Sequence, residues 1–212
     1  MAENYHHGSL KAALVSAGLS ALTRDDGPEL SLRALASELG VTVTAAYRHF
    51  PSKSDLMLEL AAVGFEELQR RLLSASSKSN PVTPLHQLHS VGEIYVQFAR
   101  DNPALLRLMF DRRGAFETND RLKQSSAAAF NVLLECVAEV RREPPQSPTA
   151  MKASLAAWSL VHGYAMLSLE GYMDVLPEQF RLSVAEVVRT FDPGGIDDTL
   201  EIRRLPVAAS RR

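Results

Sequence analysis

The chain has 212 residues, of which 46% are hydrophobic and 23% are charged, and its formal net charge is −2. This composition is typical of a globular protein with one large domain, or with a small and a medium one. The near-neutral charge excludes a uniformly basic molecule, so any surface for nucleic acid must be a local patch.

The sequence lacks targeting and membrane signals. The start, MAENYHHGSL, has neither the basic nor the apolar stretch of a secretory signal, and no run of about 18 apolar residues exists. The single cysteine, Cys136, lies in the apolar run VLLECVAEV, so we expect a buried, inert thiol. We therefore expect a cytoplasmic protein with no membrane association.

Apolar residues recur at helical spacing along nearly the whole chain, and no segment alternates like a half-buried strand. The predicted fold is all-α, with about nine helices. The first helix should begin at Ser9 as N-cap and end before the turn RDDGP. The second, at about 31–40, has Ser31 as a candidate cap and Gly40 where a glycine ends many helices.

A short helix is predicted at about 42–50, with Thr42 as its N-cap. Pro51 disfavours helical geometry at Phe50 and should end this helix. The next helix begins near Lys53, where the S-x-x-D spacing from position 52 forms a capping box. Further helices are predicted at about 53–74, 84–101, from 103, 118–142, 147–170 and 177–191, with a partly ordered tail from about 192.

The helices at about 31–40 and 42–50, joined at Gly40, match a helix-turn-helix. In this motif the first helix supports the second, which lies in the major groove and presents side chains to the bases. Phosphate oxygens suit the side chains of Thr42, Tyr47, His49 and Lys53. Two arginines, Arg33 and Arg48, can reach the edges of guanine bases. Two small residues, Thr44 and Ala45, can approach thymine methyl groups.

The segment 5–60 resembles the TetR family of transcriptional regulators, through LSLRALASELGVTVTAAYRHFPSKSDL and above all its ending AAYRHFPSKSDL. The resemblance implies a DNA-binding head at 1–52, a ligand-binding and dimerisation body at 53–212, and a homodimer on a palindromic operator in double-stranded DNA. It implies backbone contacts from Thr42, Tyr47, His49 and Lys53. It also implies that the residues nearest the bases are Arg33, Val43, Thr44, Ala45 and Arg48.

The body resembles one branch of this family, whose signature is a Trp-His-Gly set, here in AAWSLVHGYAMLSLEG as Trp158, His162 and Gly163. The segment DNPALLRLMF is similar to the same branch. In the family the last two helices pair with their symmetry mates as a four-helix bundle. This arrangement implies a dimer interface with small and β-branched residues: Ala153, Ala157, Val184, Val187 and Val188.

A ligand pocket in the body would use aromatic residues, methionines and one histidine, and the candidates are Met109, Phe110, Phe116, Phe130, Trp158, His162 and Met166. At helical spacing such residues also form an ordinary core, and a structural Trp158–His162 pair remains an alternative to ligand contact. The apolar body suggests a small, largely hydrophobic inducer, with no cofactor.

The sequence therefore predicts a ligand-responsive transcriptional regulator. Such regulators are usually repressors, and we expect binding of the inducer to release this one from its operator. The charge of residues 1–56 argues against DNA binding, because this segment carries five basic and six acidic groups and is therefore not basic overall. An alternative is an all-α enzyme with His49 or His162 as general base, but neither has a nucleophile and an orienting carboxylate at local spacing.

Two pairs of histidines are candidate metal ligands. His6 and His7 better suit an N-terminal arm, and His86 and His89, three residues apart, have no third ligand evident nearby. No metal site is predicted.

Overall fold

The computed structural model describes residues 7–23, 30–76, 83–111, 119–191 and 193. Within these residues it contains nine α-helices, one 3-10 turn and no strand, which confirms the all-α prediction. The helices are α1 (His7–Leu22), α2 (Leu32–Glu38), α3 (Val43–His49), α4 (Lys53–Ser76), α5 (Pro84–Asp101), α6 (Pro103–Phe110), α8 (Asp120–Arg141), α9 (Pro148–Leu169) and α10 (Val184–Arg189).

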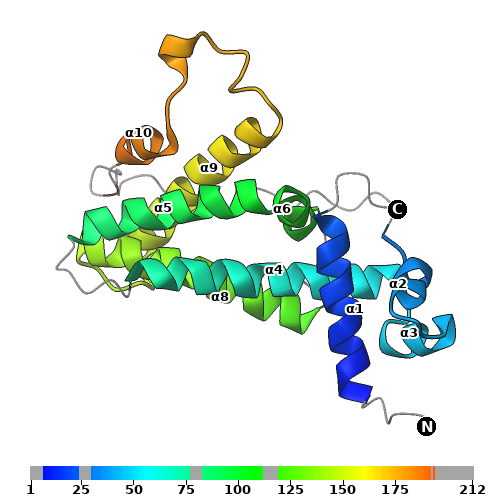
Figure 1. The fold of residues 1–212 in the computed structure, drawn as a ribbon. Coiled ribbons are helices and arrows are strands. Elements are labelled where there is room, and N and C mark those ends of the chain that lie inside the picture. Colours follow the sequence, from blue (N-terminus) through cyan, green and yellow to red (C-terminus); the bar gives the residue numbers. More distant parts are fainter. Residues whose placement is uncertain (1–6, 24–29, 77–82, 112–118, 192, 194–212) are drawn as a thin grey trace, which may run out of the picture.

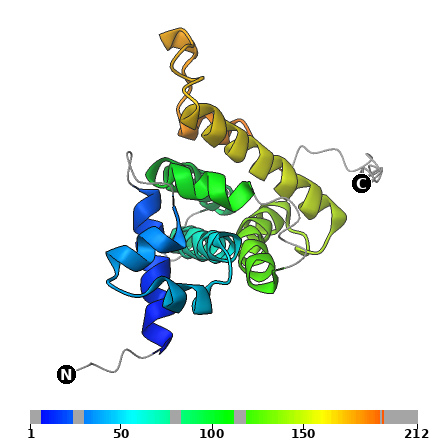
Figure 2. The ribbon, with the colours of Figure 1, turned by 90° about the vertical axis from the view of Figure 1, so that its right-hand side faces the viewer.

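The long helices α4 and α8 lie side by side and form the centre of the molecule, and α5 packs on both (Figure 1). Helix α9 packs on α5 and α8, and α10 packs on α5 and α9. In Figure 2, α9 crosses above α4 and α8, which are seen nearly end-on. Helices α1, α2 and α3 gather around the N-terminal part of α4, at one end of the body. Helix α4 therefore belongs to both parts.

The helix boundaries near the N-terminal end follow the local signals in the sequence. The Ser31 hydroxyl accepts a hydrogen bond from the Ala34 amide and caps α2. The Thr42 hydroxyl accepts one from the Ala45 amide and caps α3. Phe50 leaves the helix with φ −131° and ψ 98°, as expected for the residue before a proline.

The capping box at the start of α4 is confirmed, and it carries a testable energy. The Asp55 amide donates to the Ser52 hydroxyl (3.2 Å), and the Ser52 amide donates to the Asp55 carboxylate (2.9 Å). We expect Ser52→Ala to lower the free energy of unfolding by about 1 kcal/mol, because the Asp55 amide loses its acceptor and the Asp55 carboxylate loses the hydroxyl as a donor. Urea unfolding measures this loss. Ser54→Ala, at an exposed neighbour, is the matched control, and an equal loss there would contradict the capping role.

Two predicted boundaries are wrong. Helix α1 begins at His7, so Ser9 lies inside its first turn and is not the N-cap. The single helix predicted at 177–191 is instead a 3-10 turn at Glu178–Phe180 followed by α10. Long-range bonds explain this break, because the Tyr164 hydroxyl donates to the Leu182 carbonyl (2.9 Å). Ser183 then forms a capping box that starts α10.

The core runs without interruption from the head into the body. At the head, α1, α2 and α3 bury Leu14, Leu35 and Ala46, and α4 contributes Leu56 and Leu60 to the same cluster. None of the described helices has both the length and the apolar content needed to cross a bilayer.

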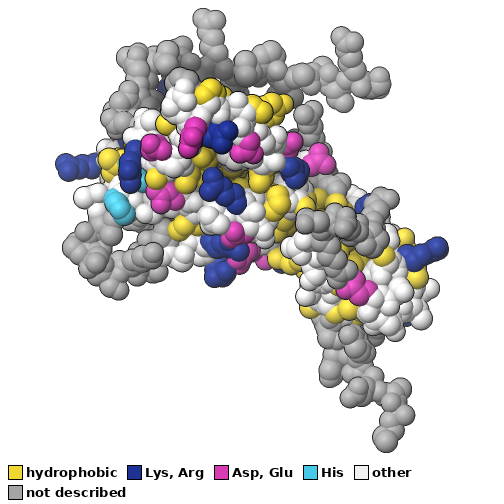
Figure 3. Space-filling view, turned by 45° about the horizontal axis from the view of Figure 1, so that its top comes forward, with side chains coloured by type: hydrophobic (Ala, Val, Ile, Leu, Met, Phe, Trp, Pro, Cys, Tyr) yellow, Lys and Arg dark blue, Asp and Glu magenta, His cyan; other side chains and the backbone are white. Residues whose placement is uncertain are grey.

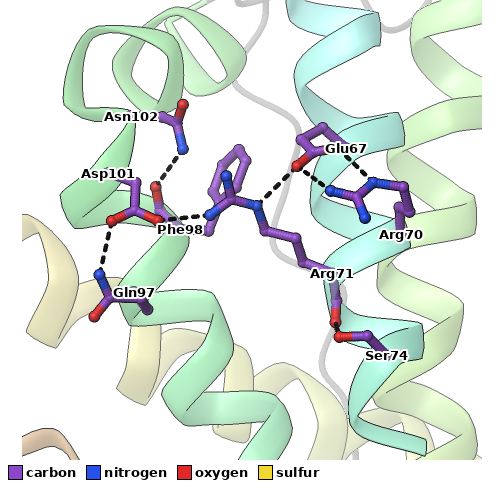
Figure 4. A network of polar contacts seen from close by, with 8 residues as sticks. All are labelled: Glu67, Arg70, Arg71, Ser74, Gln97, Phe98, Asp101 and Asn102. Carbon is purple, nitrogen blue, oxygen red and sulfur yellow. Dashed lines mark hydrogen bonds and ion pairs between the residues drawn. The ribbon is translucent and has the colours of Figure 1, made fainter. Parts of the chain in front are cut away.

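A polar network on the other side of α4 ties this helix to the C-terminal end of α5 (Figure 4). Arg70 donates two hydrogen bonds to Glu67, both of 2.7 Å, and Arg71 donates a third of 2.8 Å. Arg71 also donates to Asp101 of α5 at 2.7 Å, and its guanidinium carbon lies 5.4 Å from the centroid of the Phe98 ring. The Arg71 side chain thus joins two helices of the body.

Because of this network, the stability of the protein should change with pH in the acidic range. The hydrogen bond from Arg70, followed by that from Arg71, lowers the pKa of Glu67 from 4.5 to about 2. A lowered carboxyl pKa stabilises the fold above the unfolded value and loses that contribution as the pH falls towards the folded value. We therefore expect the difference in unfolding free energy between wild type and Glu67→Gln to shrink from pH 6 to pH 3. A constant difference in urea unfolding at both pH values would contradict this assignment.

Candidate DNA-binding surface and effector cavity

The helix-turn-helix geometry at α2 and α3 depends on one left-handed residue. Gly40 has a φ of +66°, and a Cβ there would meet nothing within 4 Å, so the backbone conformation and not crowding calls for glycine. The Val41 amide donates to the Ala36 carbonyl at 2.9 Å and closes the turn. Ala46, which is fully buried, and Phe50 then fix α3 on the core.

None of the nine residues predicted to contact DNA is buried. Six are exposed and three are half-buried. Tyr47 is the largest apolar side chain exposed on α3, at 47% of its surface. The exposed residues are Arg33, Thr42, Thr44, Tyr47, Arg48 and Lys53, and the half-buried ones are Val43, Ala45 and His49.

Thr42 has a second task besides the predicted phosphate contact. Its hydroxyl oxygen accepts the Ala45 amide at 3.2 Å as the N-cap of α3. The hydroxyl hydrogen stays available to donate to a phosphate oxygen, so the two roles are compatible. The exposed Tyr47 and Arg48 lie towards the other end of this short helix, and their side chains suit contacts with phosphates and base edges.

The charge distribution agrees with a small DNA contact surface. On the face drawn in Figure 3, basic and acidic side chains are intermixed, with hydrophobic side chains between them. No broad field of one sign covers this face, consistent with the net charge of −2. Electrostatic attraction to DNA then depends on few phosphate contacts per chain.

A cavity of about 650 Å³ lies in the body between α4, α5, α8, α9 and α10. Its wall is almost wholly apolar. The polar exceptions among the described lining residues are His89, Tyr95, Lys123, Ser126 and the indole of Trp158. A second cavity of about 520 Å³ lies where α1, α4, α6 and α9 meet. Phe110 lines both cavities and lies between them.

An aromatic cluster forms the wall at Phe110. This ring packs edge-on against Phe65, with ring centroids 5.5 Å apart. It also packs, in a tilted arrangement, against the rings of His162 and Trp158, with centroids 4.6 Å and 5.8 Å away. The Tyr95 hydroxyl is hydrogen-bonded to Nδ1 of His162 at 2.7 Å. Burial raises the pKa of Tyr95 and lowers that of His162, so both are neutral at pH 7.

The predicted pocket residues fall into four groups. Phe110, Phe130 and Trp158 line the large cavity. His162 and Met166 line the second one instead. Met109 is a correction: it is fully buried in the core, and its sulfur lies against Gly64, where an added Cβ would be 2.7 Å away. Phe116 lies outside the described residues.

Several lining residues were missed by the sequence reasoning. Most belong to α4 and α5, which the pocket prediction did not include, and two follow in α10 and just after it. The apolar stripe of α5 was the available signal, but it does not distinguish a cavity wall from a filled core. The missed residues include Phe65, Leu68, Leu72, His89, Tyr95, Lys123, Val188 and Phe191.

Three of the five residues predicted for the dimer interface have side chains that are buried within the single chain. Ala153 is fully buried, and Ala157 and Val188 are 5% and 3% exposed, so a second protomer cannot reach their side chains. Ala157 and Val188 line the cavity instead. Val184 and Val187 are half-buried against the core.

Charged side chains connect the body to the head. Arg121, in the first turn of α8, binds Glu66 through two hydrogen bonds of 3.0 Å and also binds Glu59 of α4. Glu59 in turn binds Lys11 of α1 at 2.8 Å. The Lys11 ammonium lies 5.6 Å from the centroid of the Phe50 ring, directly after α3. The chain of contacts thus runs from α8 to the residue that directly follows α3.

The remaining candidate groups show no metal geometry. Over the described ranges, no three His, Cys, Asp or Glu side chains come together as metal ligands do. His6 lies outside those ranges. Burial lowers the pKa of His89 and raises that of the Cys136 thiol to about 11, so this thiol is buried and unreactive, as predicted.

An all-α chain with an exposed helix-turn-helix at one end belongs to the helix-turn-helix class of DNA-binding proteins. Two family models match it. Residues 11–60 match the bacterial regulatory proteins of the tetR family, and residues 88–191 match the tetracyclin repressor-like C-terminal domain. The chain belongs to the TetR family of transcriptional regulators.

Solved structures share the fold of this chain. A protein of unknown function from Rhodococcus sp. RHA1 is 30% identical, over 89% of this chain and 94% of that one, with a TM-score of 0.72. A TetR/AcrR regulator from Thermobifida fusca YX-ER1 shares the fold at 18% identity, over 86% and 94% of the two chains, with a TM-score of 0.58.

A curated relative matches a shorter part. The nucleoid occlusion factor SlmA of Haemophilus influenzae (strain PittGG) is 34% identical over 85 residues, which are 39% of this chain. The match spans 37% of that protein's length.

Proposed function

We propose that this chain is a repressor that binds a palindromic operator as a homodimer and releases it when a small apolar molecule enters the large cavity. Residues 1–52 would contact DNA, and residues 53–212 would sense the molecule and dimerise. One observation supports this proposal above all. The exposed reading helix and the apolar cavity of about 650 Å³ both lie along one helix, α4.

The proposed contacts follow from exposure and chemistry. The side chains of Thr42, Tyr47, His49 and Lys53 would hold the phosphate backbone. Arg48 would read guanine from the exposed side of α3, with Arg33 supporting it from α2. Small residues of α3 would approach thymine methyls from the same helix.

The dimer would form on the outer face of α9 and not through the buried residues of this helix. Leu155 and Leu167 are exposed at 45% and 46%, and Ser159 and Gly163 lie between them at four-residue spacing, on the same face. A Cβ on Gly163 would meet nothing within 4 Å, so a second helix can approach closely there. An exposed apolar stripe with a glycine suits a symmetric helix pair.

The Trp-His-Gly set supports placing the chain in that branch of the family. Trp158 and His162 share one face of α9, with ring centroids 6.2 Å apart, and Phe110 packs on both. We propose that this pair is structural and shapes the partition between the two cavities. His162 bonds a tyrosine and not a carboxylate, which favours this role over that of a general base.

Coupling between the cavity and the head would run through Glu59. Its carboxylate joins Arg121 of α8 to Lys11 of α1, and its side chain is only 13% exposed. We expect Glu59→Gln to reduce the factor by which a bound ligand weakens DNA binding, because the neutral amide holds both cations less firmly. Titrations with DNA and ligand, separately and together, measure this factor. An unchanged factor would contradict a coupling role for Glu59.

Mobility shift with fragments tiling the DNA upstream of the protein's own gene, at low salt, tests the proposed function. We expect one fragment to shift at nanomolar to micromolar protein, while random DNA of equal length shifts only at higher concentration. The absence of any preferred fragment would count against an operator-binding repressor.

A further inference from the structure

The large cavity borders α8 over a long stretch of this helix. Its lining residues on this helix include Lys123, Ser126, Phe130 and Leu133, which follow one helical face. Ten positions separate the first from the last of them, which is roughly 15 Å of helix. An occupant that fills this space is therefore longer than it is wide.

The polar groups in the middle of the cavity wall already have partners. The Tyr95 hydroxyl is hydrogen-bonded to Nδ1 of His162 at 2.7 Å, and the Trp158 ring packs against the His162 ring with centroids 6.2 Å apart. Tyr95 and Trp158 present mainly ring surface to the cavity. Apart from His89, Lys123 and Ser126, the rest of the described wall consists of Leu, Val, Ala, Gly and Phe residues, so the body of the occupant must be largely apolar.

Lys123 differs from every other described residue of the wall, because it alone has a basic, lysine or arginine side chain. It lies at the N-terminal end of the α8 row and is exposed, so its ammonium stays hydrated while its stem borders the cavity. Other cations of the body, Arg71, Arg107 and Arg121, each bind a carboxylate. Within the described ranges Lys123 forms no ion pair.

We propose that the effector is an elongated apolar molecule with one terminal anionic group, of the carboxylate class, which binds the Lys123 ammonium. The proposal rests on the proposed function only in taking the cavity as the sensing site. An anion at this end gains a charge-assisted hydrogen bond, whereas a neutral end gains less and a cationic end is repelled. The apolar body, buried in the cavity, supplies most of the affinity.

A charge series on one alkyl chain tests this proposal. Decanoate, decanol and decylamine differ only in the terminal group, and Trp158, the sole tryptophan of the chain, lies in the cavity wall and reports binding by its fluorescence. We expect decanoate to bind best and decylamine worst. In Lys123→Gln, decanoate should lose roughly fivefold in affinity while decanol is unchanged. In Lys123→Glu, the order of decanoate and decylamine should reverse.

Control variants make the outcome decisive. Arg100→Gln removes an exposed cation of α5 that does not line the cavity, and it should leave the order unchanged. Equal binding of all three compounds to wild type, binding of none, or an equal effect of Arg100→Gln would overturn the proposal. The DNA response is read separately. Decanoate that binds at Lys123 but does not release operator DNA would refute the repressor mechanism and leave the ligand class standing.

Discussion

Arg48→Ala is expected to weaken binding to the operator by roughly a hundredfold, because each half of a dimer loses a bidentate contact with guanine. Arg48 is exposed on the short helix α3, whose position is set by the buried Ala46 and Phe50. Fluorescence anisotropy of a labelled operator, at fixed salt, measures this loss. Non-specific binding should change much less, because the other phosphate contacts remain.

Two control variants separate reading from general attraction. Tyr47→Phe removes only a hydroxyl and should weaken specific and random DNA to the same extent. Arg100→Ala removes an equal charge from α5, far along the chain from α3, and should have little effect. If Arg48→Ala lowered the affinities for operator and random DNA by the same factor, Arg48 would be a phosphate contact and not a reader.

Phe98→Ala should be among the most destabilising single changes in the body, with an expected loss of about 3–5 kcal/mol in the free energy of unfolding. Its ring is fully buried between α5 and α4, and the Arg71 guanidinium stacks near it at 5.4 Å. Truncation would leave a void in a packed region and remove this contact as well. Urea unfolding at a fixed protein concentration measures the loss.

Phe110→Ala is the matched control, with the same chemical change at a different site. Phe110 is half-buried and already borders two cavities, so its truncation enlarges an existing space. We expect a clearly smaller loss of stability there. If the two variants lost equal stability, the ring at position 98 would not have the dense surroundings that the structure assigns to it.

The sequence predicted those parts of the fold that depend on neighbouring residues. The caps Ser31 and Thr42, the left-handed Gly40 and the stop before Pro51 are local, and all four are confirmed. The same local character makes the helix-turn-helix recognisable without a structure.

The break before α10 was not predictable in this way, because it depends on distant partners. The segment at 177–183 has helix-compatible residues. Its course follows from the bond of the Tyr164 hydroxyl to the Leu182 carbonyl, and from Arg181, which donates to the carbonyls of Asp174 and Leu176. No spacing in the sequence reveals these bonds.

The cavity and the interface show a second limit of sequence reasoning. Met109 and Phe110 are adjacent apolar residues, yet one is sealed in the core and the other borders both cavities, since they point in different directions around α6. Likewise, small residues such as Ala153 suit a helix interface equally well within one chain or between two. Only the packing of the helices in the folded chain shows whether such a residue lies in the core, at a cavity or at an interface.

A nuclease footprint on the upstream DNA tests the central claim, that α3 of two chains reads a symmetric operator. We expect one protected region containing a two-fold symmetric sequence, with half-site centres about 34 Å or a multiple of it apart along the duplex. Arg48→Ala should lose this footprint at protein concentrations where wild type protects fully. Protection without symmetry, or protection unaffected by Arg48→Ala, would contradict the account.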